Sequence, residues 1–308
     1  MPSAFQQSVI DEFRANAGKV GGPFAGSDLL LLTTTGARTG QPHTTPLGHV
    51  RDGDRLLVVG SNLGAPRHPA WYHNLLAHPA VQVELGEQEF QTIAVPAEGP
   101  ARDELFARVV AEAPGYAEYQ AATERKLPVV VLRLPDPQTS PAPEITSLAD
   151  KLTEVHTWLR GQLAQVHAET EAHFATRAAH RGAGAPPPPG LGLQIRQRCL
   201  AFCQALKFHH TGEDGHVFPV MEGYHPHLRP ALDRLRDEHR SIAAVQSALA
   251  ALLADVTIAE PDRFRTELAR MTEQLTAHLD YEEAEILPLL SDVPWPPPAP
   301  APAPAPAP

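Results

Sequence analysis

Histidine and glutamate recur at one spacing in two distant stretches of the chain. "FHHTGEDGHVFP" places His209 four residues before Glu213, and "AHLDYEEAEILP" places His278 four residues before Glu282. On an α-helix this spacing puts both side chains on one face, about 40° apart. Imidazole and carboxylate together are suited to iron or zinc. The repeat therefore predicts a metal site built from two helices.

Two further histidines have the phase to face the same interior. His156 in "TEVHTWLRGQL" and His239 in "LRDEHRSIAAV" each lie among apolar residues at helical spacing. One such pair arises often by chance, but two pairs with similar flanks favour a metal site. Two carboxylates that can bridge favour two metals over one. His210 and Asp214 share the same spacing, so the register of the second segment stays open by one residue.

The elements that must position these residues are helices. Residues 146–290 show apolar residues at helical spacing in four long segments with short or proline-rich connections. This pattern predicts an up-down four-helix bundle. "GAGAPPPPG" at 182–190 is expected to be an exposed loop. Gly212 and Gly215 would each cost a helix about 1 kcal/mol, and we expect metal ligation to offset that cost.

This half of the chain resembles the hemerythrin-like HHE cation-binding family. The family motif is a histidine on the first helix, H-x-x-x-E on the second, E-H on the third and H-x-x-x-E on the fourth. It is matched by His156, by His209 with Glu213, by His239, and by His278 with Glu282. The resemblance implies a non-haem di-iron site that handles dioxygen, peroxide or nitric oxide. Oxygen-carrying members have five histidines, and the fifth stays open between His167, His173 and His210.

The first half of the chain has strand signals instead. Between residues 28 and 134, short β-branched runs are bounded by Gly, Asp or Pro, and "RDGDR" supplies an Asp-Gly hairpin turn. Helical patterns occur at about 4–17, 69–77 and 99–124. This mixture predicts an α+β domain built on a small, mostly antiparallel sheet or barrel.

Three segments of this half could bind an anionic cofactor. The Thr/Gly-rich turn in "TTTGARTGQPHTTPL" could cradle a phosphate, with Arg38 supplying charge. The helix start in "GAPRHPAWYHNL" offers free N–H groups to an anion. Tyr116 and Tyr119 lie three apart on a helix face and could border a pocket. Singly, an ordinary hairpin loop and core packing explain each segment as well.

Together, residues 25–134 resemble the deazaflavin-dependent nitroreductase family. The resemblance implies a split β-barrel of the flavin-reductase type and bound coenzyme F420, a two-electron hydride carrier with a phosphate and a glutamate tail. It implies that the phosphate and tail contact Arg38, Thr39, His43, Thr44 and Thr45. It implies that the deazaflavin contacts Gly60, Ser61, Asn62, Leu63, Ala70, Trp71, Tyr72, His73 and Asn74.

The same resemblance places Tyr116 and Tyr119 on the substrate side, with Tyr119 as the expected proton donor. The acceptor would be a quinone, a nitro compound or an enone-like molecule. Relatives often have basic residues where this chain has Ala37 and His43, which predicts weaker anion binding. A prodrug-activating member has a tyrosine where this chain has Ala113, which argues against that activity.

Bulk composition narrows the function further. The 308 residues suffice for two domains, and the net charge of −11 argues against nucleic acid as a partner. The sequence has no apolar run long enough for an integral membrane segment, and its start lacks a signal core, so we expect a cytoplasmic protein. A homodimer is compatible with this interpretation. Cys199 and Cys203 are interpreted as buried hydrophobes rather than a redox pair.

The predicted organisation is a split β-barrel at 1–134, a proline-rich linker at 135–145, the bundle at 146–290 and a disordered Pro/Ala tail at 291–308. Two functions compete. In one, the chain is an F420-dependent reductase with a fused iron module. In the other, the bundle binds or senses oxygen or nitric oxide, and the first domain is only its reductase or a non-catalytic partner. A separate hypothesis is that reduced deazaflavin feeds electrons to the iron.

Overall fold

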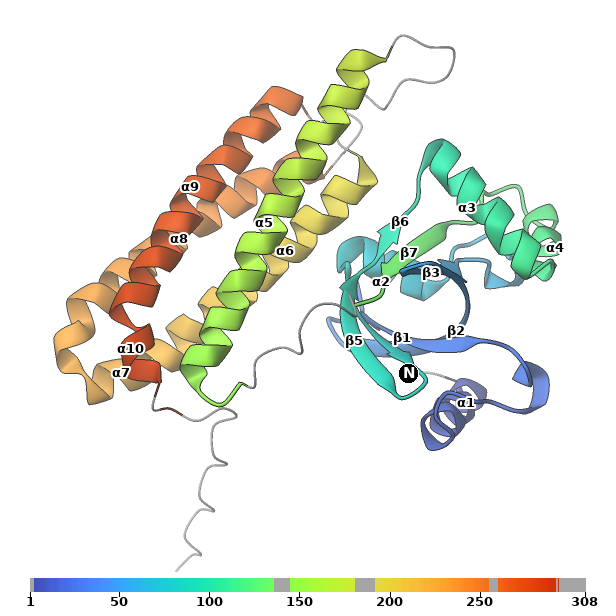
Figure 1. Ribbon diagram of the computed structural model, residues 1–308, viewed down its shortest axis with the longest axis horizontal. Helices are drawn as coiled ribbons and strands as arrows, with labels where there is room; N and C mark the ends of the chain where they lie inside the picture. Colours follow the sequence, from blue (N-terminus) through green and yellow to red (C-terminus); the bar gives the residue numbers. More distant parts are fainter. Residues whose placement is uncertain (1–2, 136–144, 181–191, 255–259, 292, 294–308) are drawn as a thin grey trace, which may run out of the picture. The chain divides into compact units, whose positions relative to one another are not determined.

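The computed structural model describes residues 3–135, 145–180, 192–254, 260–291 and 293. Every strand among them precedes residue 134, and the described residues from 148 to 290 form helices and their connections (Figure 1). The predicted linker, proline-rich loop and tail lie, apart from their edge residues, outside the described residues. No described helix combines the length and the apolar character that crossing a membrane requires.

The N-terminal domain is a nearly closed antiparallel barrel of seven strands in the order β5-β4-β1-β2-β3-β7-β6. The long strand β2 pairs with β1 through Gly48 and with β3 from His49 onward, so it curls from one half of the sheet into the other. The predicted split β-barrel is thereby confirmed. The strands are β1 Leu29–Thr35, β2 Pro42–Asp52, β3 Arg55–Val59, β4 Ala80–Leu85, β5 Gln88–Ile93, β6 Val95–Pro96 and β7 Val129–Arg133.

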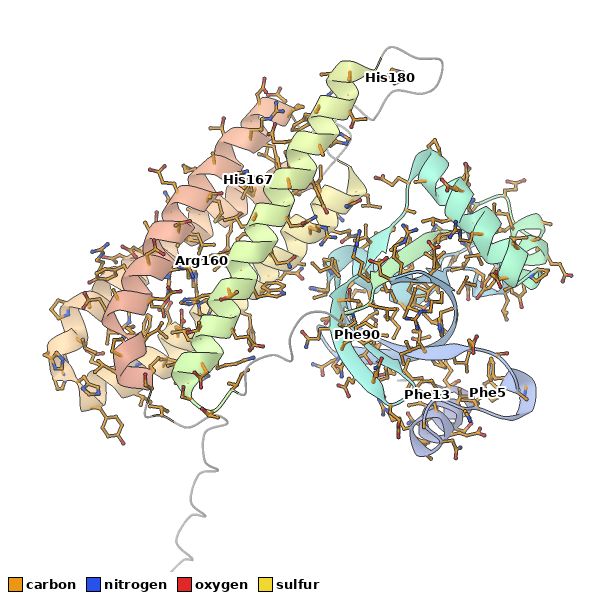
Figure 2. All side chains as sticks on the ribbon, viewed as in Figure 1. Phe5, Phe13, Phe90, Arg160, His167 and His180 are labelled. Carbon is orange, nitrogen blue, oxygen red and sulfur yellow. The ribbon has the colours of Figure 1, made fainter. Side chains whose placement is uncertain are left out.

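The alternation of side chains along β1 separates two apolar clusters. Leu30 and Leu32 point into the barrel, where α2 (Ala70–Ala77) adds Trp71. Leu29 and Leu31 point outward, onto the apolar face of α1 (Ala4–Ala15). Phe13 lies on that face in Figure 2. Successive strand residues point to opposite faces, so both faces of the strand are buried.

A third apolar cluster lies on the outer face of β3 and β7. It packs Leu105 and Val109 of α3 (Gly99–Glu112) against Leu57 and Val59. A single helix was expected over 99–124. The chain instead breaks at Pro114, because proline cannot continue the α3 hydrogen-bond ladder, and α4 (Gly115–Ala121) follows.

The C-terminal part is a four-helix bundle, as predicted (Figure 1). Short helical elements connect or extend the long helices, and one of them, a π-helical turn, is described below. The long helices are α5 Leu148–Ala179, α6 Leu193–Gly212, α8 Arg229–Leu253 and α9 Pro261–Glu285, and the short ones are α7 Phe218–Tyr224, the 3-10 turn Pro226–Leu228 and α10 Leu287–Leu290.

The helical segment that carries His209 and Glu213 continues beyond Pro219 to Tyr224. A π-helical turn at Glu213–Val217 follows α6 and leads directly into α7. Such turns insert one residue into the helical register and are frequent at functional sites. The similar endings "VFP" (217–219) and "ILP" (286–288) contribute to the packing of the bundle. Pro219 and Pro288 begin α7 and α10, and Phe218 and Ile286 share one buried apolar cluster.

Candidate metal and cofactor sites

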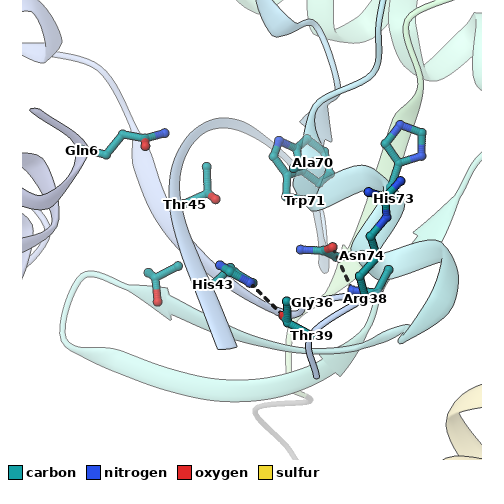
Figure 3. Close-up of a pocket in the computed structure, with 12 residues that line it drawn as sticks. Gln6, Gly36, Arg38, Thr39, His43, Thr45, Ala70, Trp71, His73 and Asn74 are labelled. Atoms are coloured by element: carbon teal, nitrogen blue, oxygen red, sulfur yellow. Dashed lines mark hydrogen bonds between the residues drawn. The ribbon is translucent and has the colours of Figure 1, made fainter. Parts of the chain in front are cut away.

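The barrel contains a cavity of about 640 Å³ beside the turn that joins β1 to β2 (Figure 3). The sequence predicted nine of its lining residues and missed Gln6, Gly36 and Ala37. Gln6 comes from α1, far away in sequence, and its only local signal was the capping box that it forms with Ser3. The predicted residues that line the cavity are Arg38, Thr39, His43, Thr44, Thr45, Ala70, Trp71, His73 and Asn74.

Asn74 fixes the β1–β2 turn beside this cavity. Its Oδ1 accepts a hydrogen bond from the Ala37 N–H at 3.1 Å, and its Nδ2 donates to Thr34 Oγ1 at 3.1 Å. Gly36 leaves room in the same turn for the side chains of Thr39 and His43. A Cβ at this position would overlap Thr39 Oγ1 and lie 2.9 Å from His43 Nε2. The turn is therefore shaped before any ligand arrives.

The cavity is suited to an anion. Arg38 lies at its edge, exposed, and forms no ion pair with any described residue. No carboxylate is among the lining side chains, which include His43 and His73. The first turn of α2 also faces this region, and Pro69 at its N-cap offers no side chain to its N–H groups. Free amides at a helix start favour negative charge.

The predicted contact segment Gly60–Leu63 does not line the cavity, and neither does Tyr72. Arg125 holds this segment by donating to the Gly60 carbonyl at 3.0 Å and the Ser61 carbonyl at 2.6 Å. Asn62 and Leu63 both have left-handed φ angles, of 47° and 53°, and the Leu63 side chain is 77% exposed. Adjacent non-glycine residues in this region store strain.

Tyr72 instead packs against the barrel core, and burial raises its pKa. Tyr116 and Tyr119 pack edge to face, with ring centroids 6.0 Å apart, against the outer apolar cluster. Burial likewise raises the pKa of the Tyr116 hydroxyl. The cofactor role of Gly60–Leu63 and Tyr72 and the catalytic role of the two tyrosines stay predictions.

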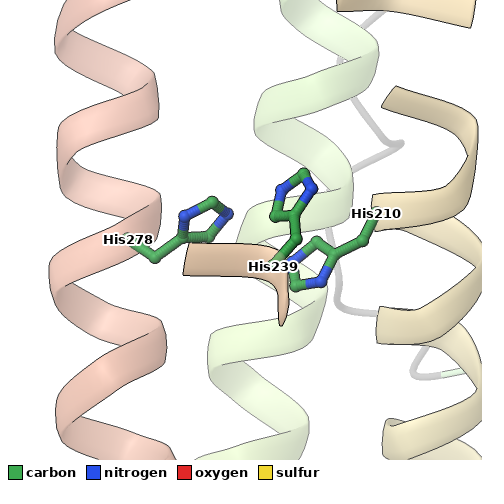
Figure 4. Close-up of side chains that lie close together, drawn as sticks. All are labelled: His210, His239 and His278. Carbon is green, nitrogen blue, oxygen red and sulfur yellow. The ribbon is translucent and has the colours of Figure 1, made fainter. Parts of the chain in front are cut away.

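In the bundle, seven side chains converge in two groups. Within each group the candidate ligand atoms all lie within 4.8 Å of one another. Figure 4 shows His210, His239 and His278 of the second group facing one another. The groups are His156, His209, Glu213 and Glu282, and His210, His239 and His278.

All six predicted ligands are therefore together, and His210 joins them. Of the three candidates for a fifth histidine, neither His167 nor His173 belongs to a group. His167 lies about two helical turns beyond Arg160 on α5, where its Nε2 contacts Thr272 Oγ1 at 2.6 Å (Figure 2). Asp214, the alternative ligand, lies behind His239, with its Oδ1 2.9 Å from Nδ1.

Each carboxylate reaches both groups. Glu213 Oε1 lies 3.1 Å from His209 Nε2, and its Oε2 lies 3.5 Å from His239 Nε2. Glu282 Oε2 lies 3.5 Å from His156 Nε2 and 3.6 Å from His278 Nε2. These contacts are too long or too poorly aligned for hydrogen bonds. Glu213 and Glu282 therefore lie between the two groups and contact histidines of both.

Burial favours the uncharged forms of these side chains when no cation is bound. It lowers the pKa of His156 and His239 to about 4 each and that of His209 to about 2. It raises the pKa of Glu282 to about 7 and that of Glu213 well above its usual range. Neutral imidazoles are the form that binds metals.

Several of the candidate ligand atoms are buried without a hydrogen-bond partner among the described residues. Buried polar groups normally have one, and leaving them without one costs free energy that a bound cation would remove. The donor set of imidazole and carboxylate fits iron. The atoms concerned are Nε2 of His210, His239 and His278, both carboxylate oxygens of Glu213, and Oε2 of Glu282.

Sequence reasoning missed Glu238 and Glu283. Glu283 Oε1 lies 2.8 Å from His156 Nδ1, and Glu238 Oε2 lies 2.9 Å from His278 Nδ1. The available signal was their position, since Glu283 follows the ligand Glu282 and Glu238 precedes His239. The pairing itself connects different helices, which the sequence does not show.

Comparison with known proteins agrees with both halves. A family model described as "F420H(2)-dependent quinone reductase" matches residues 6–134, and one described as "Hemerythrin HHE cation binding domain" matches residues 147–290. An F420H(2)-dependent quinone reductase of Mycobacterium tuberculosis is 44% identical over 126 residues, which cover 39% of this chain and 83% of the relative. A solved structure titled "Structure of F420-H2 Dependent Reductase (FDR-A)" shows 36% identity and a TM-score of 0.33, covering 34% of this chain and 94% of that one.

Proposed function

The chain belongs to the F420H(2)-dependent quinone reductase family through residues 6–134 and carries a hemerythrin HHE cation binding domain at 147–290, and from this premise we propose a two-domain oxidoreductase. Its N-terminal domain uses reduced F420 for hydride transfer to a quinone, nitro or enone-like acceptor. Its bundle binds a non-haem di-iron centre that handles dioxygen, peroxide or nitric oxide.

The shape and charge of the barrel cavity support the first part. Arg38, Thr39 and His43 line the cavity and would bind the phosphate and tail of F420. The Ala37 N–H would not bind them, because it already donates a hydrogen bond to Asn74. Ala70 and Trp71 line the same cavity and would hold the deazaflavin. Reduced F420 supplies the hydride, so the protein has to bind and orient the two reactants and needs no nucleophile of its own.

The observation that carries the second part is the sharing of Glu213 and Glu282 between two buried groups. His156 and His209 would hold one iron, and His210, His239 and His278 the other. Such a pair of irons supplies binding and redox chemistry toward oxygen, peroxide or nitric oxide. The chain supplies a site closed to bulk water, because His156, Glu213 and Glu282 are each at most 2% exposed.

The reductase part is tested by anaerobic mixing of the full chain with reduced F420 and a quinone. We expect oxidised F420 to appear at a rate that saturates with quinone. The Gly36→Ala variant should lose most of this activity, because its Cβ would displace the side chains of Thr39 and His43, which line the cavity. Gly161→Ala is the control, because Gly161 lies within α5 and a Cβ there would meet nothing within 4 Å. Absence of quinone-dependent oxidation in the wild type would refute the reductase assignment.

A further inference from the structure

Three histidines of the proposed metal centre are each held from behind by a carboxylate on another helix or turn. His156 of α5 contacts Glu283 of α9 at 2.8 Å through its Nδ1. His278 of α9 contacts Glu238 of α8 at 2.9 Å in the same way. The nitrogen involved is in each case the one directed away from the centre. The carboxylates are therefore placed to orient rings rather than to bind metal.

The third pair is formed by His239 and Asp214. His239 of α8 contacts Asp214, in the π-helical turn after α6, at 2.9 Å through Nδ1. The three pairs thus join α5 to α9, α9 to α8, and α8 to the end of α6. The fourth side of the bundle is spanned at the site itself, where Nε2 of His156 and His209 lie 3.1 Å apart. All four helices are connected through the histidines.

Two of the three carboxylates are themselves held in place. Glu283 also accepts a hydrogen bond from Arg160 at 2.6 Å, and Arg160 in turn contacts Asp280 at 2.8 Å. Glu238 accepts from Arg234 at 2.8 Å, whose guanidinium lies 3.6 Å from the centroid of the Tyr281 ring. A carboxylate with a second partner has fewer orientations to choose from.

We infer that Asp214, Glu238 and Glu283 are positioning residues for the three histidines they contact. This inference rests on the proposed metal centre. Each carboxylate accepts a hydrogen bond from the Nδ1–H of its histidine. With the proton on Nδ1, the lone pair of Nε2 points inward. The ring orientation and tautomer needed for metal binding are then set before metal arrives. Removing such a partner typically weakens metal binding 10–100-fold.

The test compares two carboxylates that share Arg160. Glu283→Ala removes the partner of His156, whereas Asp280→Ala removes another partner of Arg160 and touches no ligand. Glu283→Gln keeps an oxygen that can accept a hydrogen bond from the Nδ1–H of His156. Circular dichroism establishes that each variant is folded. Iron affinity is measured by competition with a chelator, and the protonated ring nitrogens of the metal-free chain are identified by ¹⁵N NMR of histidine.

We expect His156 in the metal-free wild type to carry its proton on Nδ1. Glu283→Ala should lose this tautomer preference and bind iron about 10–100-fold more weakly. Glu283→Gln should keep the tautomer, and Asp280→Ala should match the wild type in both measurements. If Glu283→Ala is unfolded, the inference is tested by the tautomer of His156 in the wild type and in Glu283→Gln.

A wild-type His156 protonated on Nε2, or unchanged iron affinity in Glu283→Ala, would overturn the inference. Failure of the proposed function looks different. If the wild-type chain binds no iron, the di-iron proposal is wrong, while the tautomer measurement on metal-free protein still tests the positioning role. If iron binds and the substitution changes neither quantity, only the positioning role is wrong.

Discussion

His209 and His210 are neighbours in the chain, yet they belong to different groups of candidate ligands. Adjacent side chains on a helix point about 100° apart. Both can therefore reach the bundle core only if the core faces the sector between them. Their rings lie 5.5 Å apart, and His210 stacks on His239 at 3.9 Å. The segment that carries the two histidines thereby contributes one histidine to each group.

The His210→Ala variant tests this division. It removes one of the three histidines of its group and leaves the other group intact, so we expect iron to fall from about two per chain to about one. His167→Ala is the matched control, because His167 lies in the same bundle outside both groups. Iron is counted by elemental analysis of reconstituted protein. Equal iron in both variants would exclude His210 as a ligand.

Glu282 gives a pH prediction for the metal-free chain. Burial disfavours its charged form and raises its pKa to about 7, from an ordinary value near 4.5. Its contribution to stability is present below pH 4.5 and is lost as the pH rises through 7. Glu282→Gln, which cannot ionise, should therefore stabilise the metal-free chain above pH 7 by a few kcal/mol.

Below about pH 4, the same substitution should change the free energy of unfolding little, because the wild-type carboxyl is then neutral. Chemical denaturation of metal-free protein at pH 4 and pH 8 measures both differences. Equal effects of the substitution at the two pH values would contradict the interpretation. With iron bound, the order should reverse at pH 8, since glutamine cannot bridge two cations as a carboxylate does.

Much of this site follows from the sequence, because helical spacing alone brings His209 to Glu213 and His278 to Glu282. The π-helical turn was not predictable, since two glycines signal a weak helix rather than an inserted residue. The outer pairs were also missed, because Glu238 and Glu283 meet histidines of other helices. Such contacts depend on how the helices pack, and local periodicity carries no information about that.

The barrel shows the same limit. Strand alternation and the turn residues predicted its fold, and a linear motif located Arg38 and Thr39. Gln6 was missed because α1 lies across the sheet from that motif. Asn74 was predicted as a cofactor contact, and it lines the cavity, but both of its polar groups hold the β1–β2 turn. Its substitution should therefore disturb the turn as well as the ligand.

Arg38 should act through its charge. Arg38→Ala is expected to weaken F420 binding about tenfold, because a charge-assisted contact to phosphate or carboxylate is lost. The effect should shrink at high salt, since the side chain is exposed. Fluorescence titration with oxidised F420 measures both. Arg51→Ala, an exposed arginine elsewhere on β2, is the control. A loss as large in that variant would show that overall charge, and not the cavity, is responsible.

Glycine should be more stable than alanine at position 63. Its φ of 53° is unfavourable for leucine and easy for glycine, and its side chain is 77% exposed. Leu63→Gly should raise the free energy of unfolding by about 1 kcal/mol relative to Leu63→Ala, which keeps the Cβ. Thermal unfolding of the two variants compares them. A glycine variant less stable than the alanine variant would show that the backbone there is not strained.

The proposed di-iron centre consists of two buried groups that bind two irons through shared carboxylates. Its most direct test is the iron content of the full chain after anaerobic reconstitution and desalting, compared with Glu213→Ala. We predict about two irons per wild-type chain and less than one in the variant, because Glu213 reaches both groups. The control is Glu222→Ala. Glu222 lies in α7, belongs to neither group and pairs with Arg229 and Arg236, so this variant should match the wild type. A wild-type chain without iron, or a Glu213→Ala variant that keeps two, would contradict the account.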